Sequence, residues 1–259
     1  MLLAVDVGNT NTVLGLYDGE RLAAEWRVAT VRGRTADELD VQLAGLLARR
    51  AIAPSTVDAA CVSSTVPTLV PSWEGALERA TGRPPVVIGP GIRTGMPMRI
   101  DNPRELGPDR VVNAVAAFAL VGGPCVVVDF GTSTNFDVVS REGEFLGGVI
   151  APGIEVSMEA LFARAARLGA VELVAPPTAI GKSTVACIQA GAVFGFAGQV
   201  DGIVRRIWAE LGGPCPTLAT GGLAELVVPH AETLDRHAPM LTLDGLRLIW
   251  QRNQDEGGG

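Results

Sequence analysis

The sequence predicts an α/β protein made of two similar domains, and three observations lead to this class. The chain has 259 residues, enough for one large domain or two modest ones at roughly 150 residues each. Segments that alternate like strands are interleaved with segments of helical periodicity. The pattern at the start of the chain recurs near its middle, which favours two structurally related halves over one continuous domain.

The first half reads as a strand meander followed by alternating helices and strands. Residues 2–6 form a short apolar run that ends in an acid, as expected of a buried strand that delivers a carboxylate to a sheet edge. Asp18-Gly19 is a turn signal and predicts a hairpin. Thr35 is an expected N-cap, with Glu38 three residues later. The elements expected in order are strands 2–6, 11–17 and 21–29, a helix from 35, a strand at about 57–62, a helix from Pro67 to about Ala80, a strand at 86–88 and a helix at 111–120.

The second half opens with a repeat of the first. VVDFGTSTN from residue 127 lies over AVDVGNTNT from residue 4, so that Asp6 matches Asp129 and Gly8 matches Gly131. LVGGP at 120–124 ends a helical run, so we expect an N-terminal domain at 1–120 and a C-terminal domain at 121–259. The later elements expected are strands within 126–150, a helix after Pro152-Gly153, a helical stretch at 181–211, a strand at 217–220 and a helix at 241–253.

Composition and charge argue against several classes of protein. Apolar residues make up 47% of the chain and charged residues 19%, which excludes intrinsic disorder. The net charge of −7 and the lack of a basic cluster argue against a nucleic-acid partner. The N-terminal run lacks a basic segment ahead of it, and glutamines interrupt the apolar stretch at 185–200. We therefore expect no signal peptide, no membrane span and a cytoplasmic protein.

Cysteine and histidine offer few candidate sites. The four cysteines are widely spaced, which predicts small core residues in a reducing compartment rather than a zinc site or a disulfide framework. His230 and His237 lie in no motif, and we expect them at surface or packing positions.

Each half places a similar polar turn after its first strand. Glycine lets backbone N–H groups approach anionic oxygens, and Thr, Asn and Ser side chains add neutral donors. The aspartate ahead of each turn, Asp6 or Asp129, would bind a cation that bridges to phosphate. One such pattern is more often only a turn. Two at equivalent positions, able to face one another across a cleft, predict a nucleoside triphosphate held between them.

The two turns, DVGNTN and DFGTST, resemble those of the actin/hexokinase/Hsp70 superfamily of phosphotransferases. Further segments narrow the resemblance to the type III pantothenate kinases, and it runs in order over nearly the whole chain. These segments are DNPRELGPDRVVNAVAA at 101–117, GGVIAPGIEVSMEALFARAARL at 147–168, AIGKSTVACIQAGAVFG at 179–195 and LATGGLAELV at 218–227. The resemblance implies two duplicated ribonuclease-H-like (actin-like) domains, with mixed five-stranded sheets flanked by helices and an ATP cleft between the domains.

The resemblance also implies an activity and its residues. It implies a homodimeric transferase that uses ATP to phosphorylate pantothenate to 4′-phosphopantothenate, the first step of coenzyme A biosynthesis, with Mg²⁺ and a monovalent cation, potassium or ammonium. Asp109 would be the general base, and Asp129 would hold the monovalent cation. The implied ATP contacts are Asp6, Val7, Gly8, Asn9, Thr10, Asn11, Thr12, Val13, Thr132 and Gly221, with Thr220 and Gly222 also bordering the adenosine. The implied pantothenate contacts are Gly107, Pro108, Asp109, Arg110 and Thr184.

Three positions depart from the family pattern. Ile100 stands where relatives often have tyrosine, Ser183 where asparagine is usual, and Asn135 where threonine is usual. None of them is the implied base or part of the implied phosphate loops. They bear on substrate affinity more than on the type of reaction.

The local sequence leaves other interpretations open. Asp109 follows Pro108 at an expected helix start, where both residues suit the helix geometry and dipole. Arg110 would clamp the carboxylate of the substrate or form a surface ion pair. Gly181-Lys182-Ser183-Thr184 resembles the end of a Walker A loop, but Pro176 occupies the first glycine position and no strand is expected before it. We therefore expect Lys182 at a helix N-terminus.

Two rival functions remain at this stage. One is a kinase homologue that acts as a transcriptional accessory factor without pantothenate kinase activity. The other is a related sugar or acetate-type kinase with the same phosphate loops. The presence of Asp6, Asp109 and Asp129 together favours the pantothenate kinase over the accessory factor.

Overall fold

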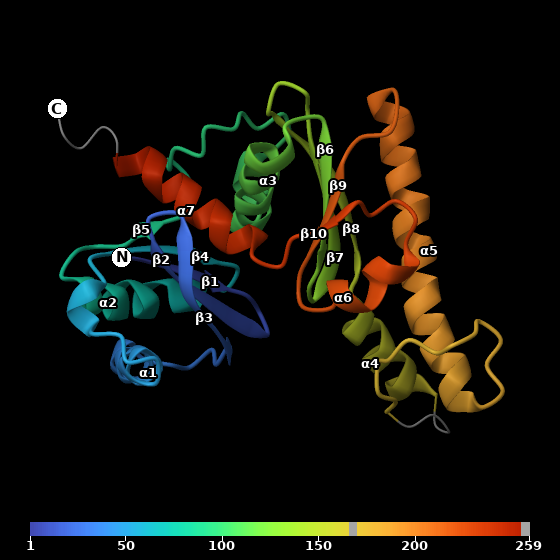
Figure 1. The fold of residues 1–259 in the computed structure, drawn as a ribbon, viewed down its shortest axis with the longest axis horizontal. Helices are drawn as coiled ribbons and strands as arrows, with labels where there is room; N and C mark the ends of the chain where they lie inside the picture. Colours follow the sequence, from blue (N-terminus) through green and yellow to red (C-terminus); the bar gives the residue numbers. More distant parts are fainter. Residues whose placement is uncertain (166–169, 255–259) are drawn as a thin grey trace. The chain divides into compact units, whose positions relative to one another are not determined.

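The computed structural model describes residues 1–165 and 170–254, and these form two compact units (Figure 1). The first unit comprises Met1–Met96, Asn102–Ala116 and the chain from Thr242 onward. The second comprises Pro97–Asp101 and Ala117–Leu241. Each unit holds one mixed five-stranded sheet with flanking helices, which confirms the fold expected from the sequence.

The first unit has the strand order β3-β2-β1-β4-β5, with β1, β2 and β3 antiparallel and β4 and β5 parallel to β1. Helices α1 and α2 cover one face of this sheet (Figure 1). The elements are β1 (Leu2–Val7), β2 (Asn11–Asp18), β3 (Arg21–Ala29), α1 (Ala36–Ala48), η1 (Pro54–Thr56), β4 (Ala59–Ser64), η2 (Pro67–Leu69), α2 (Val70–Thr81), β5 (Val86–Val87) and η3 (Pro103–Glu105). Val5 and Val7 of β1 pack into this helix-covered core, so the intervening Asp6 belongs to the opposite face because side chains alternate along a strand.

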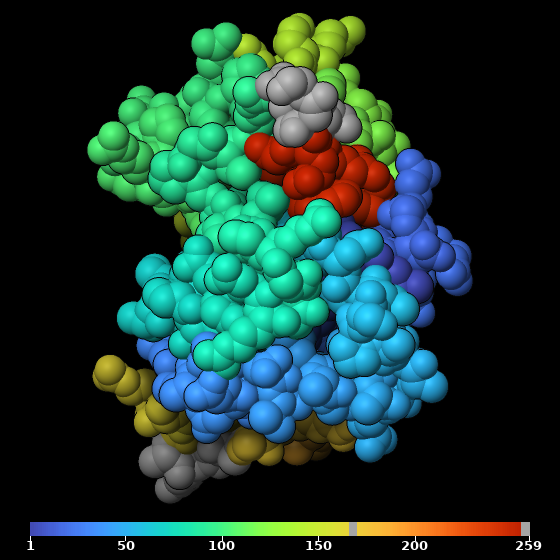
Figure 2. Space-filling model, turned by 90° about the vertical axis from the view of Figure 1, so that its left-hand side faces the viewer, coloured from blue at the N-terminus to red at the C-terminus, as the bar shows by residue number. Residues whose placement is uncertain are grey.

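The opposite face of the first sheet carries the C-terminal helix α7 (Leu241–Gln254). The Tyr17 hydroxyl donates to Asp244 Oδ1 at 2.8 Å, and the guanidinium of Arg247 lies 5.7 Å from the centre of the Tyr17 ring. A Cβ on Gly245 would lie 2.2 Å from the carbonyl oxygen of Val112 in α3 (Pro108–Val121), so the glycine permits these two helices to touch. Figure 2 shows the end of α7, in red, at the surface beside other parts of this unit.

The second unit repeats this topology, with the order β8-β7-β6-β9-β10. β6, β7 and β8 are antiparallel, and β9 and β10 run parallel to β6. Phe196, Val200 and Val204 of α5 pack on this sheet in a second core. The elements are β6 (Cys125–Phe130), β7 (Ser133–Val139), β8 (Phe145–Pro152), α4 (Ile154–Arg164), α5 (Thr184–Leu211), β9 (Thr217–Thr220), α6 (Ala224–Val227), η4 (Val228–His230) and β10 (Arg236–His237).

The two units are divided differently from the expected domains at 1–120 and 121–259, because Pro97–Asp101 and residues 117–120 belong to the second unit. The chain from Thr242 onward belongs with the first unit, although the sequence placed it in a domain of 121–259. The physical reason is that α7 packs against the first sheet through Tyr17, and that Arg252 and Asn253 hydrogen-bond the backbone at Thr94 and Arg93. Two-residue β10 and four-residue α6 were not expected, because elements this short carry no periodicity.

Helix α5 lies where the sequence predicts a helical stretch, whereas Cys187 departs from expectation. α5 has 28 residues and a mean hydropathy of 1.3 over its most apolar stretch, so by length and composition it meets the criteria for a membrane-spanning helix. Its packing in the second core is equally characteristic of a core helix of a soluble protein. Cys61, Cys125 and Cys215 are buried as expected, whereas Cys187 is exposed on α5.

Candidate functional site

The first candidate loop is the turn between β1 and β2. The Gly8 N–H donates to the Asn11 carbonyl at 3.0 Å, and a Cβ on Gly8 would lie 2.8 Å from that oxygen. Glycine is therefore needed for this close turn. Asn9, Thr10 and Asn11 are exposed at its tip. The turn thus presents short polar side chains and backbone to solvent, as a phosphate loop requires.

Neighbouring segments brace this turn from two sides. Thr65 donates through its N–H and its hydroxyl to the Val7 carbonyl, at 2.9 and 3.2 Å, and its hydroxyl accepts from Asn9 Nδ2 at 3.5 Å. On the other side the Thr30 N–H donates to the Thr10 carbonyl at 2.9 Å. Thr12 is buried, and its hydroxyl lies 2.9 Å from that of Thr30. These hydrogen bonds restrain the backbone on both sides of the turn.

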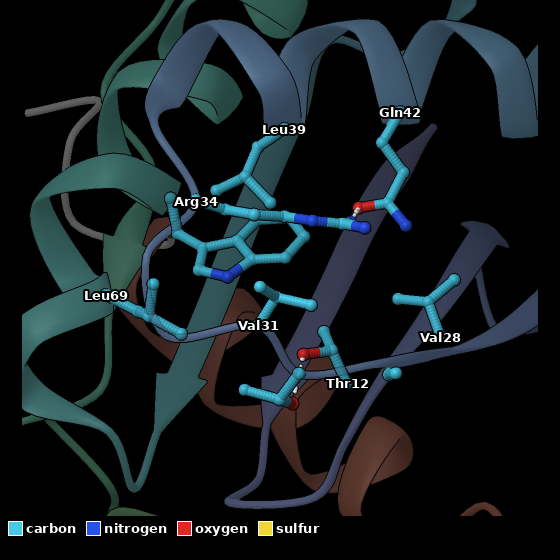
Figure 3. A pocket seen from close by; sticks show the side chains of 10 residues that line it. Thr12, Val28, Val31, Arg34, Leu39, Gln42 and Leu69 are labelled. Atoms are coloured by element: carbon cyan, nitrogen blue, oxygen red, sulfur yellow. Dashed lines mark hydrogen bonds between the residues drawn. The ribbon is translucent and has the colours of Figure 1, made fainter.

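A small pocket lies beside Thr12, which follows the tip of the turn (Figure 3). Thr12 and Thr30 form part of its wall, and the Arg34 guanidinium, which hydrogen-bonds the Gln42 side chain, lies along it. The rest of the lining is mainly apolar, with Val28, Ala29, Val31, Leu39, Leu69 and Trp73. An apolar lining suits packing rather than a polyphosphate. The exposed side of the turn is therefore the better candidate for a nucleotide.

Asp6 stands at the end of β1, one residue before the turn. In the sheet it pairs in register with Val13 of β2 and Ser63 of β4, and it is half-buried. Ser63 is fully buried, and its hydroxyl has no hydrogen-bond partner among the described residues. The end of β1 therefore combines a carboxylate with a neighbouring hydroxyl.

Asp109 lies in the first turn of α3, directly after Gly107 and Pro108. A Cβ on Gly107 would lie 2.5 Å from Asp109 Oδ1, so the missing side chain leaves room for the carboxylate to fold back over the helix start. Burial raises the pKa of Asp109 above its ordinary value, while a hydrogen bond from the Arg110 backbone N–H and the charge of Arg110 lower it. Of these opposing effects burial prevails. The result is a carboxylate that is a stronger base than an exposed aspartate.

The second candidate loop is the turn between β6 and β7, at the position equivalent to the first turn but closed one residue earlier. The Gly131 N–H donates to the Ser133 carbonyl at 3.0 Å, and Thr132 is exposed. A Cβ on Gly153 would lie 2.4 Å from the Thr132 carbonyl, and the Gly153 N–H donates to that oxygen at 3.1 Å. The start of α4 thus braces this turn as Thr30 braces the first.

Asp129 and Gly221 are brought together within the second unit. Asp129 pairs in register with Thr220, the last residue of β9, and Gly221 follows with a φ of +93°. A Cβ on Gly221 would lie 2.5 Å from Asp129 Oδ1. Only glycine fits this closely beside the half-buried carboxylate, and the backbone of Gly221 and Phe130 forms a cradle around it. Such a cradle fits a carboxylate that holds a cation.

The described residues contain no group of three or more His, Cys, Asp or Glu side chains that could hold a metal ion. A cation at Asp6 or Asp129 would therefore take most of its ligands from backbone oxygens, water or substrate phosphates. Mg²⁺ in phosphoryl-transfer enzymes commonly binds in this way, through one or two carboxylates.

The Gly181–Thr184 segment is not a Walker A loop in the structure. Residues 173–183 form no strand, and Ser183 is the N-cap of α5, where its hydroxyl accepts from the Ala186 N–H at 3.2 Å. Lys182 is exposed just before the helix, and Thr184 is the first helical residue. A strand and glycine cradle are both missing here, as the sequence indicated.

The structure shows the contacts of the three residues that depart from the family pattern. Ile100 lies near Gly147, where a Cβ would be 3.6 Å from its Cγ2. Asn135 is buried, and its Oδ1 accepts from the Ser133 hydroxyl at 2.9 Å. Ser183 caps α5. Ser183 and Asn135 thus have structural roles of their own.

Sequence reasoning missed the residues that support the turns. Thr30, Thr65 and Gly153 hold the turn carbonyls, and Arg32 donates to Asn9, yet none belongs to the repeated motif. They come from the segments after β3 and β4 and from the start of α4. The one signal in the sequence was that Thr30, Thr65 and Gly153 each come soon after an expected strand. Loops that follow neighbouring strands can lie beside the end of the first strand of the sheet.

The duplicated sheets and their two glycine turns define an actin/hexokinase-like fold. One solved structure of similar fold comes from a Campylobacter jejuni protein that has been provisionally assigned as a Baf family transcriptional activator. The two chains are 18% identical with a TM-score of 0.60, and the match covers 98% of this chain and 99% of that one. At this identity the likeness concerns the fold alone.

Sequence comparisons identify the particular family. The model of the type III pantothenate kinase family matches residues 2–206. The type III pantothenate kinase of Moorella thermoacetica is 53% identical over 253 residues, which cover 98% of this chain and all of that protein. That of Frankia alni is 55% identical with the same coverage. The chain belongs to the type III pantothenate kinase family, and it is a kinase that uses ATP.

Proposed function

We propose that this kinase transfers the γ-phosphate of ATP to the primary hydroxyl of pantothenate, with Asp109 as the general base. The observation that carries the proposal is the partly buried Asp109 carboxylate at the start of α3, with its pKa raised by burial. It stands in a chain that belongs to the type III pantothenate kinase family. The product, 4′-phosphopantothenate, enters coenzyme A biosynthesis.

Asp109 would accept the hydroxyl proton as the oxygen attacks the γ-phosphorus. A general base works best when its pKa approaches the working pH, because it must be ionised and still hold a proton well. Burial raises the pKa of Asp109 and so moves it toward the working pH. Gly107 gives the carboxylate space, and the Arg110 backbone N–H orients it. The local geometry therefore suits both a helix N-terminus and a base.

Substrate recognition would rest on Gly107, Pro108, Arg110 and Thr184. Pantothenate carries a planar carboxylate, and a guanidinium such as that of Arg110 matches that shape with paired N–H donors. Arg110 is half-buried, which lowers the entropy lost when it binds. Thr184 would add a hydroxyl from the first residue of α5.

ATP would be bound by residues of both turns. On the first unit these are Asp6 and Val7 at the strand end, the exposed tip, and Thr12 and Val13 that follow. On the second unit they are Thr132 and Gly221. The closed Gly8 turn supports this role, because backbone donors fixed in advance need no reordering when phosphate arrives.

Asp129 would hold a monovalent cation, potassium or ammonium, and Asp6 would bind Mg²⁺ through water. When bound, these cations supply charge neutralisation as phosphate charge shifts during transfer. The cradle at Gly221 supports the Asp129 assignment. A side chain at Gly221 would fill the space beside the carboxylate.

The enzyme would act as a cytoplasmic homodimer. Its second unit exposes large apolar side chains on β8, where Ile150 is 63% exposed and Leu146 and Val149 are also exposed. Exposed apolar groups gathered on one strand are typical of a subunit interface. Sedimentation equilibrium is expected to give twice the 26.9 kDa of one chain, and Ile150→Lys to give a monomer.

The experiment that tests the proposed reaction is an ADP-release assay with a panel of acceptors. Pantothenate, acetate and simple sugars are offered separately with MgATP and potassium. We expect ADP release to depend on pantothenate and the product to be its monophosphate by mass spectrometry. Faster turnover of acetate or a sugar would instead identify the related kinase, and the absence of transfer to every acceptor would favour an accessory role.

A further inference from the structure

We propose that Arg32 is an additional nucleotide-binding residue, whose guanidinium contacts the phosphates of ATP on the first turn. The inference rests on the proposed role of that turn. Arg32 follows β3 by three positions and lies outside the repeated motif. Its Nη2 donates to Asn9 Oδ1 at 3.3 Å, which places a cation directly at the turn.

The turn itself supplies no positive charge. Residues 6–13 contain one charged side chain, that of Asp6, and it is negative. The polar side chains at the tip are neutral amides and hydroxyls. A triphosphate carries several negative charges, so binding by neutral donors alone leaves charge that Mg²⁺ offsets only in part. Arg32 supplies a permanent cation where that charge would arrive.

Arg32 also has the donors to do this. A guanidinium has five N–H donors in a fixed fork, and one hydrogen bond to Asn9 leaves others for phosphate oxygens. The Arg32 side chain is exposed, so it can contact a ligand without first leaving a buried position. Arg34, two residues further on, is different, because its guanidinium lies along the pocket wall and bonds Gln42 (Figure 3).

The backbone fixes Arg32 relative to the turn. The Thr30 N–H donates to the Thr10 carbonyl at 2.9 Å, and the Thr12 and Thr30 hydroxyls are 2.9 Å apart. These contacts attach Thr30, at the start of the segment between β3 and α1, to the turn. Thr30 lies two residues before Arg32. The backbone that carries Arg32 is therefore held close to the turn, which lowers the entropy lost when the side chain binds.

The test measures the binding of MgATP and of adenosine separately by calorimetry, using the full chain. Arg32→Gln removes the charge and keeps a polar side chain, and Arg32→Lys keeps the charge without the fork. Arg21→Gln is the matched control, because Arg21 is an exposed arginine at the opposite end of β3 that pairs with Asp18. Circular dichroism confirms that each variant is folded.

We expect Arg32→Gln to weaken MgATP binding about tenfold and to leave adenosine binding unchanged, because a charge-assisted contact to phosphate is lost. The KM for ATP should rise by a similar factor while kcat changes little. Arg32→Lys should recover part of the affinity, and Arg21→Gln should match the wild type.

Two results would overturn the inference. Unchanged MgATP binding in Arg32→Gln would exclude a phosphate contact. A parallel loss of MgATP and adenosine binding would show that Arg32 only supports the shape of the turn. Both results are distinct from failure of the proposed function, in which the wild type itself would bind MgATP without phosphorylating pantothenate.

Discussion

At the scale of single residues, Asp109, the base that we propose, illustrates how a catalytic role would oppose stability. Its carboxylate is partly buried in the first turn of α3, and burial raises its pKa. A raised pKa means that the charged form is less stable in the folded protein than in the unfolded chain. The property that makes Asp109 a better base therefore costs folding free energy at neutral pH.

This cost predicts the behaviour of Asp109→Asn. The folded pKa lies above the unfolded value of about 3.9, so the cost is absent below that value and grows as pH rises through the folded pKa. Asn keeps the hydrogen-bond acceptor without the charge. The variant is expected to be at least as stable as the wild type at pH 7.5, with a difference that shrinks as the pH falls toward about 4. Urea unfolding at several pH values measures this, and an Asn variant that is less stable at pH 7.5 would refute it.

Asp129 gives a second residue-scale prediction. If it holds potassium or ammonium beside the phosphates, activity should be low in a sodium-only buffer and should be restored by either ion. Asp129→Ala should remove this response, since the cradle beside Gly221 then lacks its carboxylate. Steady-state rates in the three chloride salts provide the measurement. Equal rates in all three salts for the wild type would exclude the assignment while leaving the kinase reaction intact.

At the scale of elements, the two turns and the start of α5 offer different surroundings for an anion. Each turn closes on a glycine and is braced from a neighbouring segment. The start of α5 offers Lys182 next to a capped helix end with no preceding strand. A lysine without a glycine cradle lacks the backbone donors that a Walker A lysine works with.

This contrast predicts a ranking of three variants at exposed positions. Thr10→Val and Thr132→Val each remove a hydroxyl at similar volume and should raise the KM for ATP about tenfold. Lys182→Met should have a much smaller effect. Kinetics with ATP varied at saturating pantothenate would rank them. A ranking with Lys182→Met as the most damaged and both threonine variants near normal would return the phosphate site to the lysine.

The element scale also shows what sequence could predict. The capping box of α1 was predicted from the sequence, and the structure has both of its hydrogen bonds. The Glu38 N–H donates to Thr35 Oγ1 at 3.3 Å, and the Thr35 N–H donates to Glu38 Oε2 at 2.8 Å. The hairpin at Asp18-Gly19 was equally clear. The role proposed for Arg32 could not be predicted from sequence, because its contact with Asn9 spans 23 residues and depends on tertiary structure.

At the scale of the whole molecule, the internal repeat was the strongest sequence signal. The match of Asp6 with Asp129 predicted two related halves, and both sheets have the same strand order and directions. The assignment of α7 to the first unit could not be predicted, because it is decided by packing of a distant segment against Tyr17 and Gly15. Sequence order alone carries no information about such a return of the chain.

The central claim is that Asp109 is the base for phosphorylation of pantothenate, and one measurement tests it most directly. Wild type and Asp109→Asn are given pantothenate and MgATP, 4′-phosphopantothenate is quantified by mass spectrometry, and MgATP affinity is measured on the same samples. The account predicts that the variant forms product roughly 10²–10⁴ times more slowly while its MgATP affinity stays similar. Near-normal product formation by the folded variant would contradict it.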